Sequence, residues 1–482
     1  MNEIFHRQAN LIAGIWCQAD SNAHKTVTNP ATGDVIGTVP NCGPQETRRA
    51  IDAAHKTFQT YRHTTAGERA GMLRRLVEAI MDHQEDLAQL LTMEQGKPLA
   101  EARGEVAIGA SYVQWFAEEA RRVYGDIVPS PWGDRRLLVS KQPIGVVAAI
   151  TPWNFPSSMI ARKIGPALAV GCTAVFKPAI QTPYSGLAWG VLCEMAGFPK
   201  GAVNIVTGDA SPIGKEFSSN EKVRKLTFTG STKIGQLLIR QSADNVQKLS
   251  MELGGNAPFI VFDDADIDKA VTAGMAAKFR NSGQTCVCTN RFYVQDKVFD
   301  QFLEKLVKAS NDLVVGDGTA KDTTQGPLID EAAVIKVESI LADAKAKGGR
   351  IMCGGERHAL GSTFFQPTVI ADATEEMQCA SDEIFGPLAP VFRFHEDEEV
   401  IARANATPYG LAAYFCTRDL GRAFRVSEAL EYGLVGVNEG IITSEVAPFG
   451  GLKHSGLGKE GGKQGVEEYL ETKYTCIGGL AD

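Results

Sequence analysis

Two cysteines one residue apart stand in the polar, glycine-containing segment NSGQTCVCTN, residues 281–290. A thiolate is a strong nucleophile and thiols are partly ionised near neutral pH, so Cys286 and Cys288 are both candidates for covalent catalysis. No cysteine belongs to a CxxC pair, and the eight histidines are scattered along the chain. The pair therefore lacks companions at zinc-ligand spacing, and we expect no metal site.

Glu252 and Lys177 are two further candidate site residues. Glu252 lies between Met251 and Leu253 and precedes two glycines, so we expect its carboxyl group to be partly desolvated. Desolvation raises a carboxyl pKa towards the range of a general base; a structural, ion-paired glutamate is the alternative. Lys177 closes a β-branched run before Pro178, where it reaches ribose hydroxyls or remains a solvated surface residue.

A glycine-containing turn, GSTKIG, follows another predicted strand. Gly230, Ser231 and Thr232 open a segment of helical character, where free N–H groups and the helix dipole favour a phosphate group. The segment is not GxGxxG, and glycine followed by Ser or Thr is also typical of an ordinary helix N-cap. Both interpretations of this turn stay open.

The elements that must position these residues follow from the hydrophobic pattern. Apolar residues at helical spacing predict a helix over 68–91, with Gly96 and Pro98 as stop signals. From about residue 144, β-branched runs alternate with spans of helical length, which predicts βαβ units and a parallel sheet. A second series begins after MELGG (251–255). Ligands of such sheets bind beyond the carboxyl ends of the strands, where the polar motifs fall.

Composition limits the class of protein. A chain of 482 residues is longer than one hydrophobic core usually supports, so we expect two large α/β lobes with attachments. The net charge is -8 and no basic block exists, which argues against a nucleic-acid partner. The N-terminal MNEIFHRQAN has no apolar run and no window is long enough to span a membrane, so we expect a cytoplasmic protein without a membrane partner.

An arm is predicted between the first helices and the βαβ series. Residues 123–141 hold two prolines and end in an alternating pattern, and the C-terminal YLETKYTCIGG has strand character. We expect this C-terminal strand to pair with the arm. These two segments indicate that subunits pair.

The motifs in their order resemble those of the aldehyde dehydrogenase superfamily over nearly the whole chain. They are TPWNFP (151–156), KPA (177–179), FTGSTKIG (228–235), MELGG (251–255), GQTC (283–286), EIFGP (383–387) and PFGGLKHSG (448–456). Within the family the chain looks most like the succinate-semialdehyde dehydrogenases. The resemblance implies the aldehyde dehydrogenase fold: a Rossmann-like cofactor domain, an α/β catalytic domain and a small β oligomerisation element.

The resemblance also implies a division of the chain. We expect an NAD(P)-binding domain of residues 1–122 and 142–252, a catalytic domain of 253–438, and an oligomerisation arm of 123–141 and 465–482. Residues 439–464 are expected to return to the cofactor domain. A homodimer or a dimer of dimers is the expected assembly.

For catalysis, the resemblance makes Cys286 the nucleophile, because this cysteine closes the GQTC motif and Cys288 falls outside it. The side-chain amide of Asn154 and the backbone N–H of Cys286 resemble the family's oxyanion hole. Glu252 resembles the general base that activates water for thioester hydrolysis. A hydrolase or acyl-transferase using Cys286 lacks a histidine partner near any motif, and a noncatalytic relative would not need these three residues together.

On the cofactor side, Glu383 resembles the ligand of the nicotinamide ribose and Phe385 a packing aromatic. The other cofactor contacts that the resemblance implies are Trp153, Asn154, Lys177, Gly230, Ser231 and Leu253. The family commonly has a glutamate three residues after the lysine, which repels a 2′-phosphate; this chain has Ile180. We expect use of NADP or NAD, with a preference for NADP; Lys163 or a main-chain N–H is the alternative determinant.

The substrate of a semialdehyde enzyme carries a distal carboxylate that needs cationic ligands. Arg162 and Arg280 match arginines that semialdehyde members use, and Ser444 resembles a third ligand; pairing of the arginines with surface acids is the alternative. The expected reaction is oxidation of succinate semialdehyde to succinate, a step of 4-aminobutyrate degradation. Glutarate semialdehyde or another aldehyde is the alternative, because one methylene changes binding by only about 1–3 kcal/mol.

Cys288 suggests regulation. Its position next to the proposed nucleophile allows a strained disulfide with Cys286, and strained disulfides are the reducible kind. Reversible oxidative inactivation is one interpretation of Cys288. A small packing residue is the other.

Overall fold

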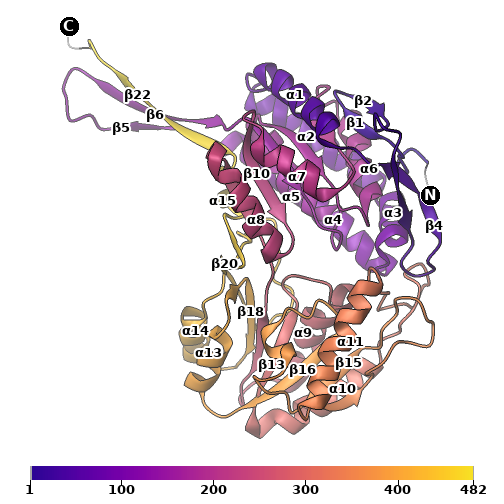
Figure 1. The fold of residues 1–482 in the computed structure, drawn as a ribbon. Helices are drawn as coiled ribbons and strands as arrows, with labels where there is room; N and C mark the ends of the chain where they lie inside the picture. Colours follow the sequence, from indigo (N-terminus) through magenta and orange to yellow (C-terminus); the bar gives the residue numbers. More distant parts are fainter. Residues whose placement is uncertain (1–2, 481–482) are drawn as a thin grey trace.

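The computed structural model describes residues 3–480, which form two α/β lobes and a projecting arm (Figure 1). The first lobe contains an eight-stranded sheet in the order β2-β1-β9-β8-β7-β10-β11-β21. Its strands are β1 (Asn10–Ile12), β2 (Ile15–Cys17), β7 (Val146–Ile150), β8 (Thr173–Lys177), β9 (Val203–Ile205), β10 (Val223–Thr229), β11 (Lys248–Glu252) and β21 (Gly456–Leu457). The strands from β9 to β11 are parallel, as the alternating pattern predicts.

Helices cover both faces of this sheet. Val147 and Ala149 of β7 join the core formed with α2–α6, whereas Val146, Ala148 and Ile150 join the core under α1, α7 and α8. The helices are α1 (Pro44–Tyr61), α2 (Ala66–Asp82), α3 (Gln84–Gln95), α4 (Leu99–Glu119), α5 (Ser158–Val170), α6 (Pro183–Met195), α7 (Ala210–Ser219) and α8 (Thr232–Ser242). A strand buried on both faces must be apolar throughout, which explains the continuous run VVAAI.

The second lobe repeats this layering. Its seven-stranded sheet has the order β14-β15-β16-β13-β12-β18-β19, with α9 and α10 on one face and α11, α13 and α14 on the other. The strands are β12 (Ala257–Val261), β13 (Thr289–Gln295), β14 (Arg350–Cys353), β15 (Thr368–Ala371), β16 (Leu388–Phe394), β18 (Ala412–Cys416) and β19 (Leu434–Val437). The helices are α9 (Ile267–Phe279), α10 (Phe299–Asn311), α11 (Glu331–Ala346), α13 (Asp397–Asn405) and α14 (Leu420–Ala429), with the short α12 (Gln378–Ser381) nearby.

The arm is a three-stranded antiparallel sheet that projects from the body (Figure 1). It consists of β5 (Asp126–Val128), β6 (Arg136–Pro143) and β22 (Leu470–Ile477), and β22 pairs with β6 from Leu470 opposite Pro143 to Ile477 opposite Arg136. This confirms the predicted pairing of the C-terminal strand with the arm. The remaining small elements are the hairpin of β3 (His24–Thr28) and β4 (Val35–Pro40), the pair of β17 (Tyr409–Gly410) and β20 (Leu452–Lys453), and α15 (Gly462–Glu467).

One predicted helix is wrong. The helix expected over 68–91 is two helices, α2 and α3, separated at His83, whose backbone leaves the helical region with φ -112 and ψ 19. Apolar residues at helical spacing continue through both helices, so the pattern does not reveal a break of one residue.

The domain boundaries stay a prediction. The first sheet takes strands from residues 10–17, 146–252 and 456–457, and the second from 257–437. Residues 1–2 and 481–482 of the predicted segments lie outside the described residues. Among the helices between residues 3 and 480, none is long and apolar enough to cross a membrane.

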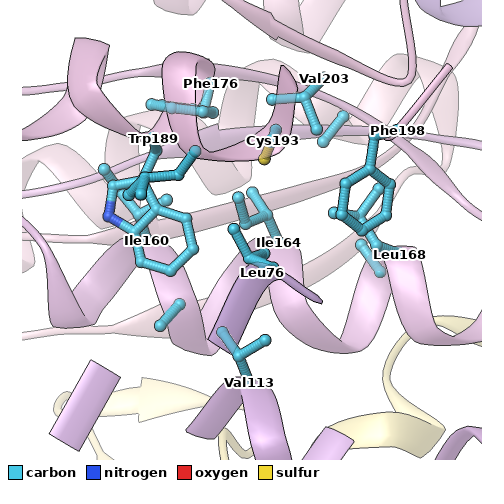
Figure 2. Packing of buried hydrophobic residues seen from close by; sticks show 14 of the residues in the cluster. Leu76, Val113, Ile160, Ile164, Leu168, Phe176, Trp189, Cys193, Phe198 and Val203 are labelled. Atoms are coloured by element: carbon cyan, nitrogen blue, oxygen red, sulfur yellow. The ribbon is translucent and has the colours of Figure 1, made fainter. Parts of the chain in front are cut away.

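Helix α5 carries one of the candidate arginines and is held in the core of the first lobe. Figure 2 shows Ile160, Ile164 and Leu168 of α5 among side chains that include Leu76 and Trp189. These residues recur every four positions, so they lie on one helical face. All three have 0% exposure.

We expect Ile164→Ala to destabilise the first lobe by about 2–5 kcal/mol, because the surrounding core relaxes only partly around the lost methyl groups. The measurement is the melting temperature by circular dichroism. Leu420→Ala on exposed α14 is the control, since Leu420 is 73% exposed. An equal decrease of the melting temperature in both variants would contradict the burial of Ile164 in this core.

Candidate active site

The carboxyl ends of four neighbouring strands bring the predicted motifs to one edge of the first sheet. Asn154 follows β7, Lys177 ends β8, Gly230 follows β10 and Glu252 ends β11. These strands are parallel neighbours, so their ends share an edge, which is where open α/β sheets bind ligands. The second lobe supplies Cys286 from the loop between α9 and β13.

The loop before Cys286 has an unusual backbone. Asn281, Ser282 and Gly283 have φ values of 53, 57 and 75, so all three are in the left-handed region. A Cβ on Gly283 would lie 2.2 Å from the carbonyl oxygen of Gly386. The motif NSG therefore matches a turn that few other sequences could form, because Asn and Gly tolerate this conformation best.

Two cavities meet at Cys286, which is the only described residue that lines both. The first cavity, of about 380 Å³, is lined by residues of both lobes, among them Asn154, Glu252 and Glu383. The second, of about 250 Å³, is lined by residues that include Phe155, Arg162 and Arg280. A thiol that lines two cavities can contact the occupants of both.

Most of the predicted cofactor residues line the first cavity. They are Trp153, Asn154, Gly230, Ser231, Leu253, Glu383 and Phe385. The rings of Trp153 and Phe385 meet edge to face, with centroids 5.5 Å apart. The donor set fits a dinucleotide, because the first turn of α8 and the Glu383 carboxylate offer a helix N-terminus and a hydroxyl acceptor.

Lys177 and Ile180 lie outside the lining of this cavity. The Nζ of Lys177 donates to the carbonyl oxygen of Pro178 at 2.9 Å, and burial lowers the pKa of this amine to about 8. Ile180 packs against the core of the first lobe. Contact of these residues with a cofactor stays a prediction.

Glu252 is a buried carboxyl group whose two oxygens have no hydrogen-bond partner among the described residues. Burial is the main reason that its pKa lies well above the usual range, and the neighbouring Glu460 raises it further, while Lys163 acts in the opposite direction. The predicted direction of the pKa shift is confirmed. The alternative, a structural glutamate in an ion pair, does not apply, because Glu252 forms no ion pair with a described residue.

Asn154 lines the first cavity, and its side-chain amide is bound to the nucleophile loop. Its Nδ2 donates to the carbonyl oxygen of Gln284 at 3.0 Å, which leaves the second N–H available for another acceptor. Its Oδ1 is buried and has no partner among the described residues. The amide is therefore tethered to the nucleophile loop and still has a hydrogen to donate.

The surroundings of the half-buried Cys286 disfavour the thiolate form of its side chain. Burial raises the pKa of this thiol to about 12, and the charges of Glu383 and Glu252 add to the effect, against Arg162 and Arg280. Sequence patterns do not reveal how deeply a thiol is buried or which carboxylates face it. Glu383 itself has a pKa raised to about 7 by burial, and it accepts a hydrogen bond from the Gly255 N–H at 3.0 Å.

Arg162 and Arg280 both line the second cavity. The Nε and Nη1 of Arg162 are buried and have no hydrogen-bond partner among the described residues, and its guanidinium lies 4.7 Å from the ring of Phe449. The guanidinium of Arg280 lies 5.6 Å from the ring of Phe155 and makes no ion pair within residues 3–480. Neither arginine pairs with a surface acid, so both have donors left for an anion.

Ser444 does not line the second cavity. Its Oγ donates to Glu445 Oε2 at 3.4 Å, and the neighbouring Thr443 lines the cavity instead. Sequence reasoning also missed Glu101 and Glu105, two acids of α4 that line the same cavity. In the sequence they are only acidic residues on a predicted helix, and acidic residues on a helix usually face solvent.

Cys288 lies away from both cavities. Its Sγ donates to the carbonyl oxygen of Lys278 at 3.2 Å, and each cysteine of the described chain is a free thiol. A disulfide with Cys286 requires Cys288 to leave this bond, and it stays a prediction. Among residues 3–480, no group of three or more His, Cys, Asp or Glu side chains is arranged to hold a metal ion.

Comparison with known proteins gives the family. The succinate-semialdehyde dehydrogenase (NADP(+)) GabD of Escherichia coli K12 is 58% identical to the chain, with 99% of each covered. A glutarate-semialdehyde dehydrogenase of Pseudomonas aeruginosa is 57% identical, again with 99% of each covered. The crystal structure of an E. coli NADP-dependent enzyme superposes with a TM-score of 0.98 at 58% identity, covering 99% of each chain.

The model of the aldehyde dehydrogenase family matches residues 16–475. This match spans both lobes, the arm, Cys286 and the residues that line the two cavities. It agrees with the fold that the motifs of the sequence predict. The chain belongs to the aldehyde dehydrogenase family.

Proposed function

We propose that the protein oxidises succinate semialdehyde to succinate with NADP as the preferred cofactor and NAD as a weaker one. The observation that carries this proposal is a pair of arginines, Arg162 and Arg280, that line a cavity ending at Cys286 and form no ion pair with any residue from 3 to 480. A buried guanidinium without a partner is unfavourable unless an anion completes it. The relative named as succinate-semialdehyde dehydrogenase (NADP(+)) supports the substrate and the cofactor.

In the proposed reaction, the Cys286 sulfur adds to the aldehyde carbon, and the thiol proton passes to a base. The oxygen of the resulting thiohemiacetal becomes negative, and the Asn154 amide and the Cys286 backbone N–H stabilise it by hydrogen bonds. A bound nicotinamide cofactor supplies the hydride acceptor. Loss of hydride leaves a thioester on Cys286.

Hydrolysis of the thioester is the step that we assign to Glu252. Its buried carboxyl group lines the same cavity as Cys286 and has no competing partner. In its ionised form it removes a proton from the attacking water, which then releases the carboxylic acid and restores the thiol. A raised pKa makes Glu252 a stronger base once it is ionised.

Glutarate semialdehyde is the second candidate substrate. The relative of that name is 57% identical, nearly as similar as the succinate-semialdehyde enzyme. One methylene separates the two substrates, and its effect in a pocket is about 1–3 kcal/mol. Both aldehydes carry the carboxylate that the arginines would bind, so direct comparison of the two is part of the test below.

The arm supports a proposal of subunit pairing. A three-stranded sheet with both faces in water is at the limit of independent stability. Ile127 of β5 is 75% exposed and Tyr474 of β22 is 57% exposed. We assign the covering surface to a second copy of the chain, in a homodimer or a dimer of dimers, and a cytoplasmic location remains part of the prediction.

The substrate proposal is tested by the formation of reduced nicotinamide with succinate semialdehyde, glutarate semialdehyde and propanal. We expect Arg162→Met and Arg280→Met each to lower kcat/KM for the two charged substrates by about 10–100-fold, since charge-assisted hydrogen bonds are lost. The loss for propanal should be smaller by about tenfold or more, because propanal has no carboxylate, although removal of either cation also disfavours the Cys286 thiolate. Arg103→Met, which removes an exposed arginine paired with Glu85, is the control. Equal losses for charged and uncharged aldehydes would refute the assignment.

Cofactor preference is tested at Ile180. A carboxylate at this position repels the 2′-phosphate of NADP, so we expect Ile180→Glu to lower kcat/KM for NADP by at least about tenfold while the value for NAD is kept or increases. Ile180→Gln introduces a similar shape without the charge and should keep the NADP preference. If the two variants behave alike, the charge at this position does not decide the cofactor.

Thiol activation is tested by alkylation of the cofactor-free protein. Because the Cys286 pKa is raised to about 12, the thiolate fraction and the rate of reaction with iodoacetamide should rise about tenfold per pH unit from about pH 8 to pH 10. Glu383→Gln removes a neighbouring negative charge and should speed the reaction at each pH. Cys286→Ser corrects for the other thiols. A rate that levels off below about pH 9 would contradict the raised pKa.

A further inference from the structure

Lys97 is a buried cation around which the loop TPWNFPS (151–157) is folded. Its side chain is 0% exposed, and its Nζ lies 2.6 Å from Oε2 of Glu105. The same Nζ donates to the backbone carbonyl oxygen of Asn154 at 2.8 Å and lies 3.9 Å from the centre of the Phe155 ring. One ammonium group thus contacts two consecutive residues of the loop that carries the oxyanion amide.

Glu105 also binds this loop, at its C-terminal end. Its second oxygen, Oε1, accepts hydrogen bonds from the backbone N–H groups of Ser157 at 2.9 Å and Ser158 at 3.2 Å, at the start of α5. The Lys97–Glu105 pair therefore fixes both the middle and the end of the loop. It also fixes the first turn of the helix that carries Arg162.

The end of α3 and the first turn of α4 hold the nucleophile loop through Asn281. Gln95 Nε2 donates to Asn281 Oδ1 at 3.0 Å, and the Asn281 backbone N–H donates to Glu101 Oε2 at 2.9 Å. The Nδ2 of Asn281 then donates to the carbonyl oxygen of Asn154 at 3.0 Å. The Asn154 carbonyl therefore receives one hydrogen bond from Lys97 in the first lobe and one from the nucleophile loop of the second.

We propose that Lys97 is a positioning residue that fixes the Asn154 amide relative to Cys286 by holding the Asn154 carbonyl. The inference rests on the proposed function of Asn154 as the oxyanion donor. An oxyanion donor is effective only when it is preorganised within a few tenths of an ångström. A backbone carbonyl held from two sides limits rotation of the residue, so its side-chain N–H keeps one direction.

The choice of a lysine supports this role. A buried ion pair is often no more stable than apolar residues of the same size, so stability alone does not explain Lys97. Lys225 provides an internal comparison, because its side chain is also 0% exposed, pairs with Glu468 and lies 5.0 Å from the Tyr469 ring. Lys225 donates to Ser250 Oγ and does not contact the loop of residues 151–157.

The test is a double-mutant cycle of Lys97→Met and Asn154→Ala, measured with the aldehyde that the wild-type protein oxidises best. We expect Lys97→Met to lower kcat by about 10–100-fold and to change KM for the cofactor by less than about threefold. In the Asn154→Ala background, Lys97→Met should lower kcat by less than about threefold further, because its effect passes through Asn154. Lys225→Met is the matched control and should leave kcat within about threefold of the wild type.

Each alternative result has a separate meaning. If Lys97→Met lowers kcat by the same factor in both backgrounds, Lys97 does not act through Asn154 and the inference is overturned, while the function of Asn154 stands. If Asn154→Ala is as active as the wild type, the oxyanion assignment and the inference both fail. A loss in Lys225→Met equal to that in Lys97→Met would reduce the effect to general destabilisation and also overturn the inference.

Loss of Lys97 leaves Glu105 as an unpaired buried charge, which can impair folding. The variant Lys97→Met/Glu105→Gln avoids this problem, because glutamine keeps an oxygen to accept from Ser157 and Ser158 without the charge. We expect this double variant to have the kcat and KM values predicted for Lys97→Met alone, with a melting temperature near that of the wild type. Wild-type kcat in this folded variant would overturn the inference.

Discussion

The burial of Glu252 and the partial burial of Cys286 are the constraint on which the rest of the site depends. Both groups lie at the junction of the two lobes, and burial is the main cause of both raised pKa values. In the cofactor-free protein this environment favours the neutral thiol and the neutral carboxyl group. The reactive form of each group therefore depends on what enters the cavities.

The two cavities on either side of Cys286 differ in the ionisable residues that line them. The first is bordered by Glu252 and Glu383, whereas the second contains Arg162 and Arg280. In the proposed function, the carboxylate of a semialdehyde would lie at the two arginines, with its aldehyde at the thiol.

The second cavity also contains its own acids. Glu105 is neutralised by Lys97, and Glu101 accepts the N–H of Asn281, so neither carboxylate forms an ion pair with the two arginines. Burial is the main cause of the raised pKa of Glu101. The acids of α4 thus serve the backbone around the site, and the positive charge of the arginines remains available.

Strand ends and motifs were predictable because they depend on local sequence. The apolar run VVAAI and the residues after it place Asn154 at a sheet edge without any knowledge of the rest of the chain. The Cys286 pKa was not predictable, since it depends first on burial and then on Glu383 and Arg162, which are distant in the sequence. Lys97 was overlooked for a related reason: Gly96 and Pro98 explain the local turn fully, and only the fold brings Asn154 to the lysine.

The position of the last strands has a consequence for the order in which the protein can be completed during synthesis. The first lobe contains β21, and the arm contains β22, both from the last part of the chain. Lys163, which is buried in the first lobe, pairs with Glu460 at 2.5 Å. The ribosome must therefore synthesise the whole second lobe before Glu460 can pair with Lys163 in the first. Until then, the sheet of the first lobe lacks its edge strand β21.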